Sequence, residues 1–112
     1  MLRVAIKRVR PGKESRLRAW LAELNSRADE VRETLRGETV RAEQAYIVAG
    51  DEGPLLVYVM EAEDFGQGSK AFAASSHKLD AEHKEVMREC VGESLKLDPL
   101  YDVALQTRPR DE

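Results

Sequence analysis

The chain has few of the residues on which several classes of protein depend. It contains a single cysteine, Cys90, so no intrachain disulfide can form and a disulfide-stabilised secreted domain is excluded. Aromatic residues make up only 5% of the 112 residues, too few for the ring platforms on which RNA bases stack. No stretch approaches the roughly 20 consecutive apolar residues that a membrane-spanning helix needs.

The charge balance and the N-terminal pattern narrow the expectation further. Eighteen Lys and Arg against 21 Asp and Glu give a net charge of −3, which offers little attraction for nucleic-acid phosphates. The first ten residues alternate charged and apolar side chains and lack the continuous apolar core of a signal peptide. We therefore expect a cytoplasmic protein that binds neither nucleic acid nor a membrane.

Hydrophobic periodicity predicts a strand and then a long helix in the first third of the chain. Residues 2–9 alternate with period two, which predicts a strand that buries Leu2, Val4 and Ile6 on one face. An apolar stripe with helical spacing runs over residues 13–36 and predicts one continuous amphipathic helix there.

The middle of the chain predicts a hairpin followed by a short helix. Residues 39–48 are polar at their start and apolar at their end, and residues 55–60 read LLVYVM, which is typical of a strand buried on both faces. The turn at residues 50–54 contains Gly and Pro and joins the two strands. Asp64 is placed to cap a short helix over residues 64–73.

The C-terminal third predicts one more helix and one more strand. A helix is expected over residues 79–91, ended by Gly92. Residues 99–107 alternate again and predict the last strand. A single domain over residues 1–107 would then be followed by a polar tail at residues 108–112.

The predicted order β-α-β-β-α-β is that of a ferredoxin-like α+β fold. In this fold both helices cover one face of a four-stranded antiparallel sheet. The opposite face is left partly apolar by residues 55–60, and an exposed apolar face of this size calls for a partner. A symmetric homodimer that packs sheet on sheet meets that need.

Four parts of the chain carry a resemblance to a known superfamily. They are Pro11-Gly12-Lys13 after the first strand, Trp20, the segment Tyr58-Val59-Met60-Glu61-Ala62 before Asp64, and Ser76-His77-Lys78-Leu79-Asp80-Ala81-Glu82-His83-Lys84. Through them the chain resembles the dimeric α/β-barrel superfamily and, within it, a group of uncharacterised small bacterial proteins. The resemblance implies a homodimer with a ligand cleft between the sheet and the helices.

That superfamily is functionally broad. It includes cofactor-free monooxygenases of antibiotic biosynthesis, polyketide cyclases, muconolactone isomerases, stress-response proteins, haem-binding members and ligand-sensing domains. The resemblance therefore implies a small-molecule site but names no reaction.

His83 is the residue that the pattern singles out for chemistry. On a helical wheel of about 100° per residue it falls within the apolar stripe of Leu79, Val86 and Cys90. Asp80 lies three residues before it, within reach of the ring on a helix. We expect His83 to be a general acid or base oriented by Asp80. The alternative is a buried histidine that fixes the helix against the sheet.

Five further residues are candidates for lining a ligand site. Glu43 shares its strand face with apolar residues, where burial raises the pKa of a carboxyl group and makes it a possible base. The candidate ligand-binding residues are His77, Tyr58, Glu43, Tyr46 and Trp20. The alternative for each is a structural role in the core, at an interface or at a rim.

The two histidines do not form a metal site by spacing. His77 and His83 are six residues apart and would point about 120° away from each other on one helix, whereas helical zinc ligands are spaced by three or four. We therefore expect no metal and no cofactor. A haem-binding barrel with His83 or His77 as the iron ligand is the least favoured interpretation.

Two classes of function remain open from the sequence. The first is a small-molecule-binding dimeric α/β-barrel protein, a cofactor-free isomerase, cyclase or monooxygenase accessory to bacterial secondary metabolism, with His83 as acid or base. The second is a non-catalytic module that binds a ligand or a partner. Whether the protein is an enzyme is not decided by the sequence.

Overall fold

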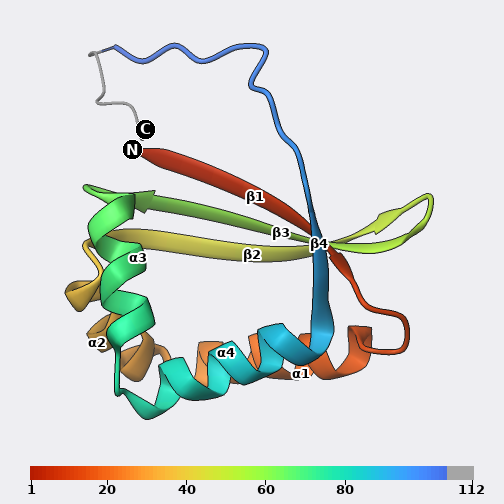
Figure 1. The fold of residues 1–112 in the computed structure, drawn as a ribbon, viewed down its shortest axis with the longest axis horizontal. Helices are drawn as coiled ribbons and strands as arrows, with labels where there is room; N and C mark the ends of the chain where they lie inside the picture. The colour runs from red at the N-terminus through yellow and green to blue at the C-terminus, as the bar shows by residue number, and fades with distance from the viewer. Residues whose placement is uncertain (106–112) are drawn as a thin grey trace.

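The computed structural model describes residues 1–105 and shows an α+β fold with one antiparallel sheet (Figure 1). The elements are β1 (Leu2–Val9), α1 (Glu14–Ser26), α2 (Ala28–Gly37), β2 (Val40–Gly50), β3 (Gly53–Ala62), α3 (Phe65–Ala74), α4 (Lys78–Cys90) and β4 (Val91–Leu95). The sheet order is β2-β3-β1-β4, and every neighbouring pair is antiparallel. This order confirms the predicted class and is compatible with a ferredoxin-like fold.

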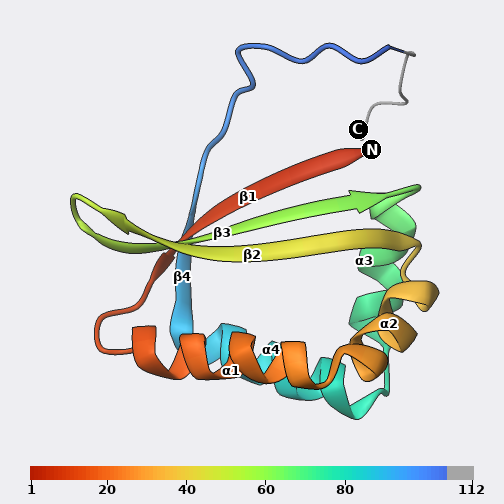
Figure 2. The same cartoon turned by 180° about the vertical axis from the view of Figure 1, so that it is seen from behind.

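All four helices lie on the same side of the sheet (Figures 1 and 2). At one end, α1 and α4 pack against the sheet around a core in which Leu17, Leu56 and Cys90 are almost completely buried. Burial also raises the pKa of the Cys90 thiol, as expected for a structural cysteine. Within residues 1–105 no helix is both long and apolar enough to cross a membrane.

The prediction that β1 buries Leu2, Val4 and Ile6 is wrong, because β1 has the opposite orientation. Leu2 and Val4 are 60% and 47% exposed. The helix-facing side of β1 instead carries Arg3, Ala5 and Lys7, which line a cavity under the sheet. Period two identifies the two faces of a strand but not which face meets the helices. Here the helices enclose a partly polar space, so the charged face turns inward.

The side of the sheet away from the helices, which we call the outer face, is correspondingly apolar. Its members follow from the strand alternation and the pairing of β1 with β3 and of β2 with β3. Its larger apolar members are Leu2, Val4, Ile6, Tyr46, Val48, Leu55, Val57 and Val59, and Arg8, Gln44 and Glu61 lie on the same face. None of these side chains is fully buried.

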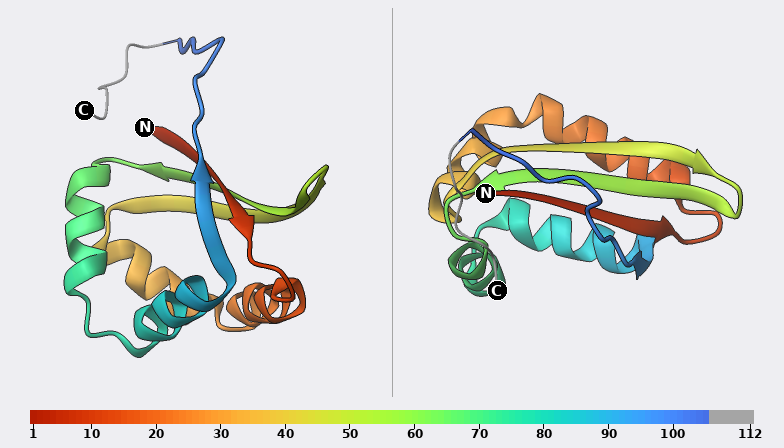
Figure 3. Two further views of the ribbon diagram at one scale, coloured as in Figure 1. Left: turned by 45° about the vertical axis from the view of Figure 1, so that its right-hand side comes forward. Right: turned by 90° about the horizontal axis from the view of Figure 1, so that it is seen from above.

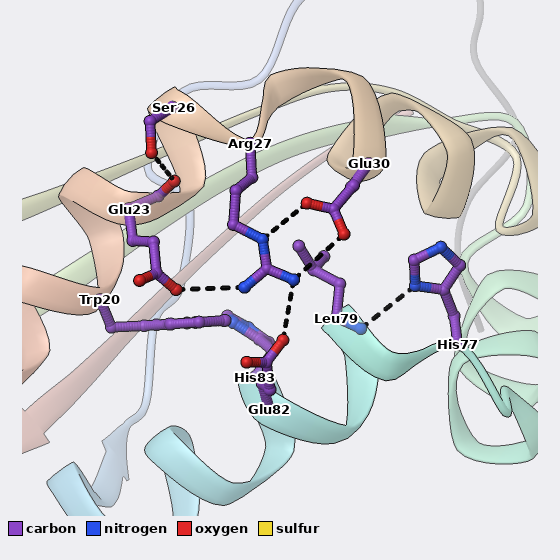
Figure 4. Close-up of polar contacts among 9 residues, drawn as sticks. All are labelled: Trp20, Glu23, Ser26, Arg27, Glu30, His77, Leu79, Glu82 and His83. Atoms are coloured by element: carbon purple, nitrogen blue, oxygen red, sulfur yellow. Dashed lines mark hydrogen bonds and ion pairs between the residues drawn. The ribbon is translucent and has the colours of Figure 1, made fainter.

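The single long helix predicted over residues 13–36 is broken in two at Arg27. The backbone of Arg27 leaves helical geometry, with φ −113° and ψ 33°. Its guanidinium bonds to Glu23 of α1 at 3.1 Å and to Glu30 of α2 at 2.7 Å. A third bond of 2.8 Å reaches Glu82 of α4 (Figure 4). The apolar stripe continues across this one-residue break, so periodicity does not reveal it.

The last strand is not where the alternation places it. The chain passes from α4 into β4 (Val91–Leu95) without a loop, and β4 pairs with β1. Of the predicted strand 99–107, the part up to residue 105 forms no strand, and Leu100 and Tyr101 are 99% and 85% exposed. Residues 106–107 and the predicted tail 108–112 lie outside the described residues.

Residues 97–105 form an arm that leaves β4 on the side of the outer face, away from the helices (Figures 1 and 3). Its apolar side chains are Leu97, Leu100, Tyr101, Val103 and Leu105, all of them exposed. The alternation that predicted a strand therefore describes an apolar arm outside the domain core.

The predicted short helix is confirmed as α3, capped by Asp64, whose Oδ1 accepts from the backbone N–H of Gln67 at 2.9 Å. Inside α3, Gly68 packs directly on the C-terminal end of α2. A Cβ at Gly68 would lie 2.5 Å from the carbonyl oxygen of Glu38. This close approach joins the two helices that form one end of the cavity.

Gly68→Ala should therefore destabilise the protein by about 1–3 kcal/mol, the usual cost of overpacking. Thermal unfolding measures this as a lower melting temperature. The matched control is Gly37→Ala, at the end of α2, where a Cβ would meet nothing within 4 Å. Equal melting temperatures for the two variants would contradict the packing described here.

Candidate functional site

A cavity of about 500 Å³ lies between the inner face of the sheet and helices α2, α3 and α4. Its polar lining consists of Arg3, Lys7, Thr34, Glu38, Glu43, Tyr58, Ser69, Asp80, His83 and Lys84. Its larger apolar lining residues are Leu24, Val31, Leu35, Val40, Leu56, Met60, Phe65, Phe72, Leu79 and Met87. The volume and the mixture of many apolar with a few polar groups are those of a small-molecule site.

The ring of His83 is fixed by two aromatic residues. The indole Nε1–H of Trp20 donates to Nδ1 of His83 at 2.9 Å, and the Tyr58 hydroxyl lies 3.5 Å from Nε2. Figure 4 shows Trp20 and His83 side by side between α1 and α4. Because an indole can only donate, Nδ1 must be the unprotonated nitrogen, and neutral His83 carries its proton on Nε2.

The same arrangement keeps His83 uncharged. Burial lowers the pKa of His83, the charge of Lys7 lowers it further, and the charge of Asp80 partly opposes both. An imidazolium would also direct a second N–H at the indole N–H of Trp20. His83 therefore stays neutral with a fixed tautomer.

The prediction that Asp80 orients His83 through a hydrogen bond is wrong. Both ring nitrogens face other partners, Trp20 and Tyr58. Asp80 acts on the ring only through its charge. The spacing of Asp80 and His83 on the helix is compatible with a hydrogen bond between them. In the folded chain, however, the two ring nitrogens contact Trp20 on α1 and Tyr58 on β3.

Tyr58 and Glu43 continue the polar contacts from His83 toward β2. The Tyr58 hydroxyl is close enough to the Glu43 carboxylate to donate to it, which favours the charged form of Glu43. Burial outweighs this effect, and together with the charge of Asp80 it raises the pKa of Glu43. Burial and the charges of Glu43 and Glu38 raise the pKa of Tyr58, which remains protonated. Both residues line the cavity.

Glu38 is a site residue that sequence reasoning missed. It follows the last residue of α2 and lines the cavity. Burial, with the charges of Asp80 and Glu43, raises its pKa to about 7, while Lys84 acts in the opposite direction. A glutamate just after a helix end resembles any solvated terminus, so its sequence position gave no signal. Arg3 and Lys7 were missed because the charged face of β1 was assigned to solvent.

Two predicted residues lie away from the cavity lining. His77 is the N-cap of α4, with its Nδ1 accepting from the backbone N–H of Leu79 at 3.1 Å. Its Nε2 lies 3.8 Å from a carboxylate oxygen of Glu33. Tyr46 is on the outer face and donates to Oε1 of Gln44 at 2.8 Å. It borders a second hollow at the β2 edge.

Trp20 is a core residue that acts on the site through His83. Its side chain is 6% exposed and does not line the cavity. The prediction that it binds ligand directly is therefore replaced by a positioning role.

Neither histidine is arranged to bind haem in the cavity. The nitrogens of His83 are both engaged, and His77 is outside the lining. Within residues 1–105 no group of three His, Cys, Asp or Glu side chains is placed to hold a metal ion. The polar lining consists of side chains that can form hydrogen bonds and exchange protons.

Fold and cavity together define an α+β protein with a partly apolar, charged cavity between one face of an antiparallel sheet and its helices. A family model matches residues 2–109, and its description is a family of unknown function, DUF6176. Since the match spans nearly the whole chain, the protein belongs to this family. No curated protein and no solved structure matches the chain.

Removing the charge of Glu38 should stabilise the protein above neutral pH. Its folded-state pKa of about 7 lies above the ordinary value of 4.5, so folding takes up a proton between these values. Its contribution to stability is therefore present below about pH 4.5 and is lost as the pH rises through about 7. Glu38→Gln should melt at a higher temperature than the parent at pH 8, and the difference should shrink toward pH 5.

The matched control is Asp51→Asn, at an exposed carboxylate in the turn between β2 and β3. Its melting temperature should follow the parent at both pH values. If Glu38→Gln also ran parallel to the parent from pH 5 to pH 8, Glu38 would not be a buried, repelled carboxyl group.

Proposed function

We propose that the cavity binds a small organic molecule and performs acid–base chemistry on it without a cofactor, as an isomerase, cyclase or monooxygenase does. The observation that carries this proposal is the line of polar contacts Trp20–His83–Tyr58–Glu43, which begins in the core and ends in a cavity of about 500 Å³. A network that only fixed the fold would not need to end on a carboxylate with a raised pKa.

Glu43 is the base in this proposal. Its raised pKa brings it closer to the operating pH than an ordinary glutamate, where a general base is most effective. Glu43 is placed on β2 opposite Met60, so it stands on the inner face beside Tyr58. A proton on a carbon next to a carbonyl group would pass to its carboxylate.

Tyr58 is the hydrogen-bond donor to the substrate oxygen. When substrate binds, the Tyr58 hydroxyl turns from Glu43 to the substrate oxygen, and because its pKa is raised it keeps its proton and donates to the negative charge that develops there. His83 is a positioning residue, since its only N–H points at the Tyr58 oxygen and its other nitrogen is held by Trp20. His83, which the sequence analysis expected to be the acid or base itself, therefore acts through Tyr58 in this proposal.

The resulting reaction is an enolisation. Glu43 takes the carbon-bound proton, Tyr58 stabilises the enolate oxygen, and the proton on Glu43 returns to the same or a neighbouring carbon. Return to a different carbon is an isomerisation. In a cyclisation the enolate carbon attacks a second carbonyl carbon of the same molecule, the π bond of that carbonyl breaks, and the proton on Glu43 passes to its oxygen.

Deuterium exchange tests this chemistry without knowledge of the natural substrate. NMR in D₂O would follow the loss of the α-proton signals of cyclohexanone, acetophenone and dimethylaminoacetone. The parent protein should accelerate exchange of at least one of these ketones. Glu43→Gln should return the rate to that of buffer, and Tyr58→Phe should lower it by roughly a hundredfold.

Glu61→Gln is the control for the exchange experiment, because Glu61 is an exposed carboxylate on the same strand as Tyr58. This variant should accelerate exchange of the ketone α-protons as much as the parent does. No acceleration by the parent, or acceleration that survives Glu43→Gln, would refute the proposed chemistry.

We also propose that the chain is a ferredoxin-like member of the dimeric α/β-barrel superfamily and works as a cytoplasmic homodimer. The support is the outer face, which is apolar on β1, β2 and β3, and the apolar arm that leaves β4 on the same side. A monomer would expose both to water. A second copy covers both by symmetry, since each chain offers the same face and arm.

Light scattering tests the homodimer. The parent should have twice the mass of a single chain, and Val4→Lys should shift it toward the monomer because Val4 is in the outer face and 47% exposed. Lys96→Glu, at an exposed position just past β4, is a charge-change control that should remain a dimer. A monomeric parent would contradict the homodimer and favour a different protein as the partner of the outer face, which is the non-catalytic alternative.

A further inference from the structure

Three carboxylates converge on the cavity from three different elements. Glu38 follows α2, Glu43 belongs to β2 and Asp80 belongs to α4. The charges of Asp80 and Glu43 act on Glu38, and the charge of Asp80 acts on Glu43. Buried charges of one sign repel each other strongly where water is scarce. Such an arrangement is costly unless something of opposite charge occupies the space.

The environment of Asp80 indicates that the space between the three carboxylates is connected to the cavity. The Asp80 side chain is 4% exposed, and it makes no hydrogen bond or ion pair with any residue of the described chain. Within the same residues no side-chain polar atom is both sealed from solvent and unpaired. The carboxylate oxygens of Asp80 must therefore open onto the cavity that Asp80 lines.

Within residues 1–105 neither Lys84 nor Lys7 forms an ion pair with Asp80. Lys84 acts on Glu38, but its ammonium sits 4.8 Å from the centre of the Phe72 ring and 3.4 Å from the carbonyl oxygen of Ala73. Lys7 acts on His83. The guanidinium of Arg3 lies over the Phe65 ring, 4.3 Å from its centre.

A metal ion does not fit this arrangement. No three His, Cys, Asp or Glu side chains of residues 1–105 come together closely enough to bind one ion. A cation that reaches Asp80 and the two glutamates must therefore be larger than a metal ion. An ammonium or guanidinium group on a carbon skeleton has both the charge and the size, and it donates several hydrogen bonds in different directions.

We propose that the cavity takes an organic cation, a primary amine or guanidinium compound, with its charged group among Asp80, Glu38 and Glu43 and its carbon skeleton against Met60, Phe65 and Phe72. This inference rests on the proposed function and specifies its ligand class. The apolar lining removes the skeleton from water, and the carboxylates select the charge.

Binding of matched probes tests the charge preference. The cations are butylamine and 2-phenylethylamine, the neutral isosteres are butanol and 2-phenylethanol, and the anions are butanoate and 3-phenylpropanoate. Thermal shift and calorimetric titration at pH 7.5 should show binding of at least one amine, with an affinity about tenfold or more above its neutral and anionic counterparts. Equal or tighter binding of the alcohol or the carboxylate, or no binding by either amine at 10 mM, would overturn the inference.

Asp80→Asn tests the residue that carries the inference. The variant should lose amine affinity by about tenfold or more, whereas Glu61→Gln should leave it unchanged. In the absence of ligand, Asp80→Asn should melt within a few degrees of the parent, because relief of the repulsion from Glu38 and Glu43 offsets the loss of a favourable carboxylate position in the first turn of α4. A large loss of stability would mean that Asp80 has a structural role, and would overturn the inference.

Failure of this inference is distinguishable from failure of the proposed function. If the parent exchanges the neutral ketones through Glu43 but binds no amine, the acid–base chemistry stands and the cationic ligand is wrong. If the amines bind through Asp80 but no ketone exchanges, the ligand class stands and the chemistry is wrong.

Discussion

The hydrogen bond from Trp20 to His83 marks the boundary on which the rest of the molecule depends. On one side of it, α1 and α4 pack tightly on the sheet around Leu17 and Cys90. On the other side the helices stand away from the sheet and enclose the cavity. The indole N–H fixes the tautomer of His83, and this leaves a single N–H to act on Tyr58. A contact that begins as core packing thus determines the hydrogen-bond direction at the cavity wall.

The cavity also contains groups that lower the stability of the folded state. Three carboxylates face the same space, and the pKa of Glu38 is about 7 because burial, and then the charges of Asp80 and Glu43, disfavour its ionised form. A core selected only for stability would replace Asp80 with an apolar residue, since a buried unpaired charge is unfavourable. The presence of the three carboxylates near Tyr58 and His83 is the reason to regard this end of the domain as functional.

The sequence predicted the parts of the fold that local patterns determine. The hairpin of β2 and β3 and the Asp64 cap follow from turn residues and capping chemistry, and both are present. Sequence patterns failed where contacts between elements distant in the chain determine the structure. The alternation of β1 does not say which face meets the helices, the stripe through Arg27 does not show a one-residue break, and the exposed residues 97–105 alternate as a strand does. For the site, Glu43 and Tyr58 were found because they lie on a buried strand face, whereas Glu38 acquires its character only from neighbours distant in sequence.

Trp20 has one more consequence for the protein in solution. It is the only tryptophan in the chain, and its indole nitrogen is one hydrogen bond away from a ring that lines the cavity. Indole emission responds to the hydrogen bonding of its N–H and to nearby charge. Under excitation that the three tyrosines do not absorb, the fluorescence of the unlabelled protein therefore comes from a single indole just behind the cavity wall, a built-in optical reporter of whatever enters the site.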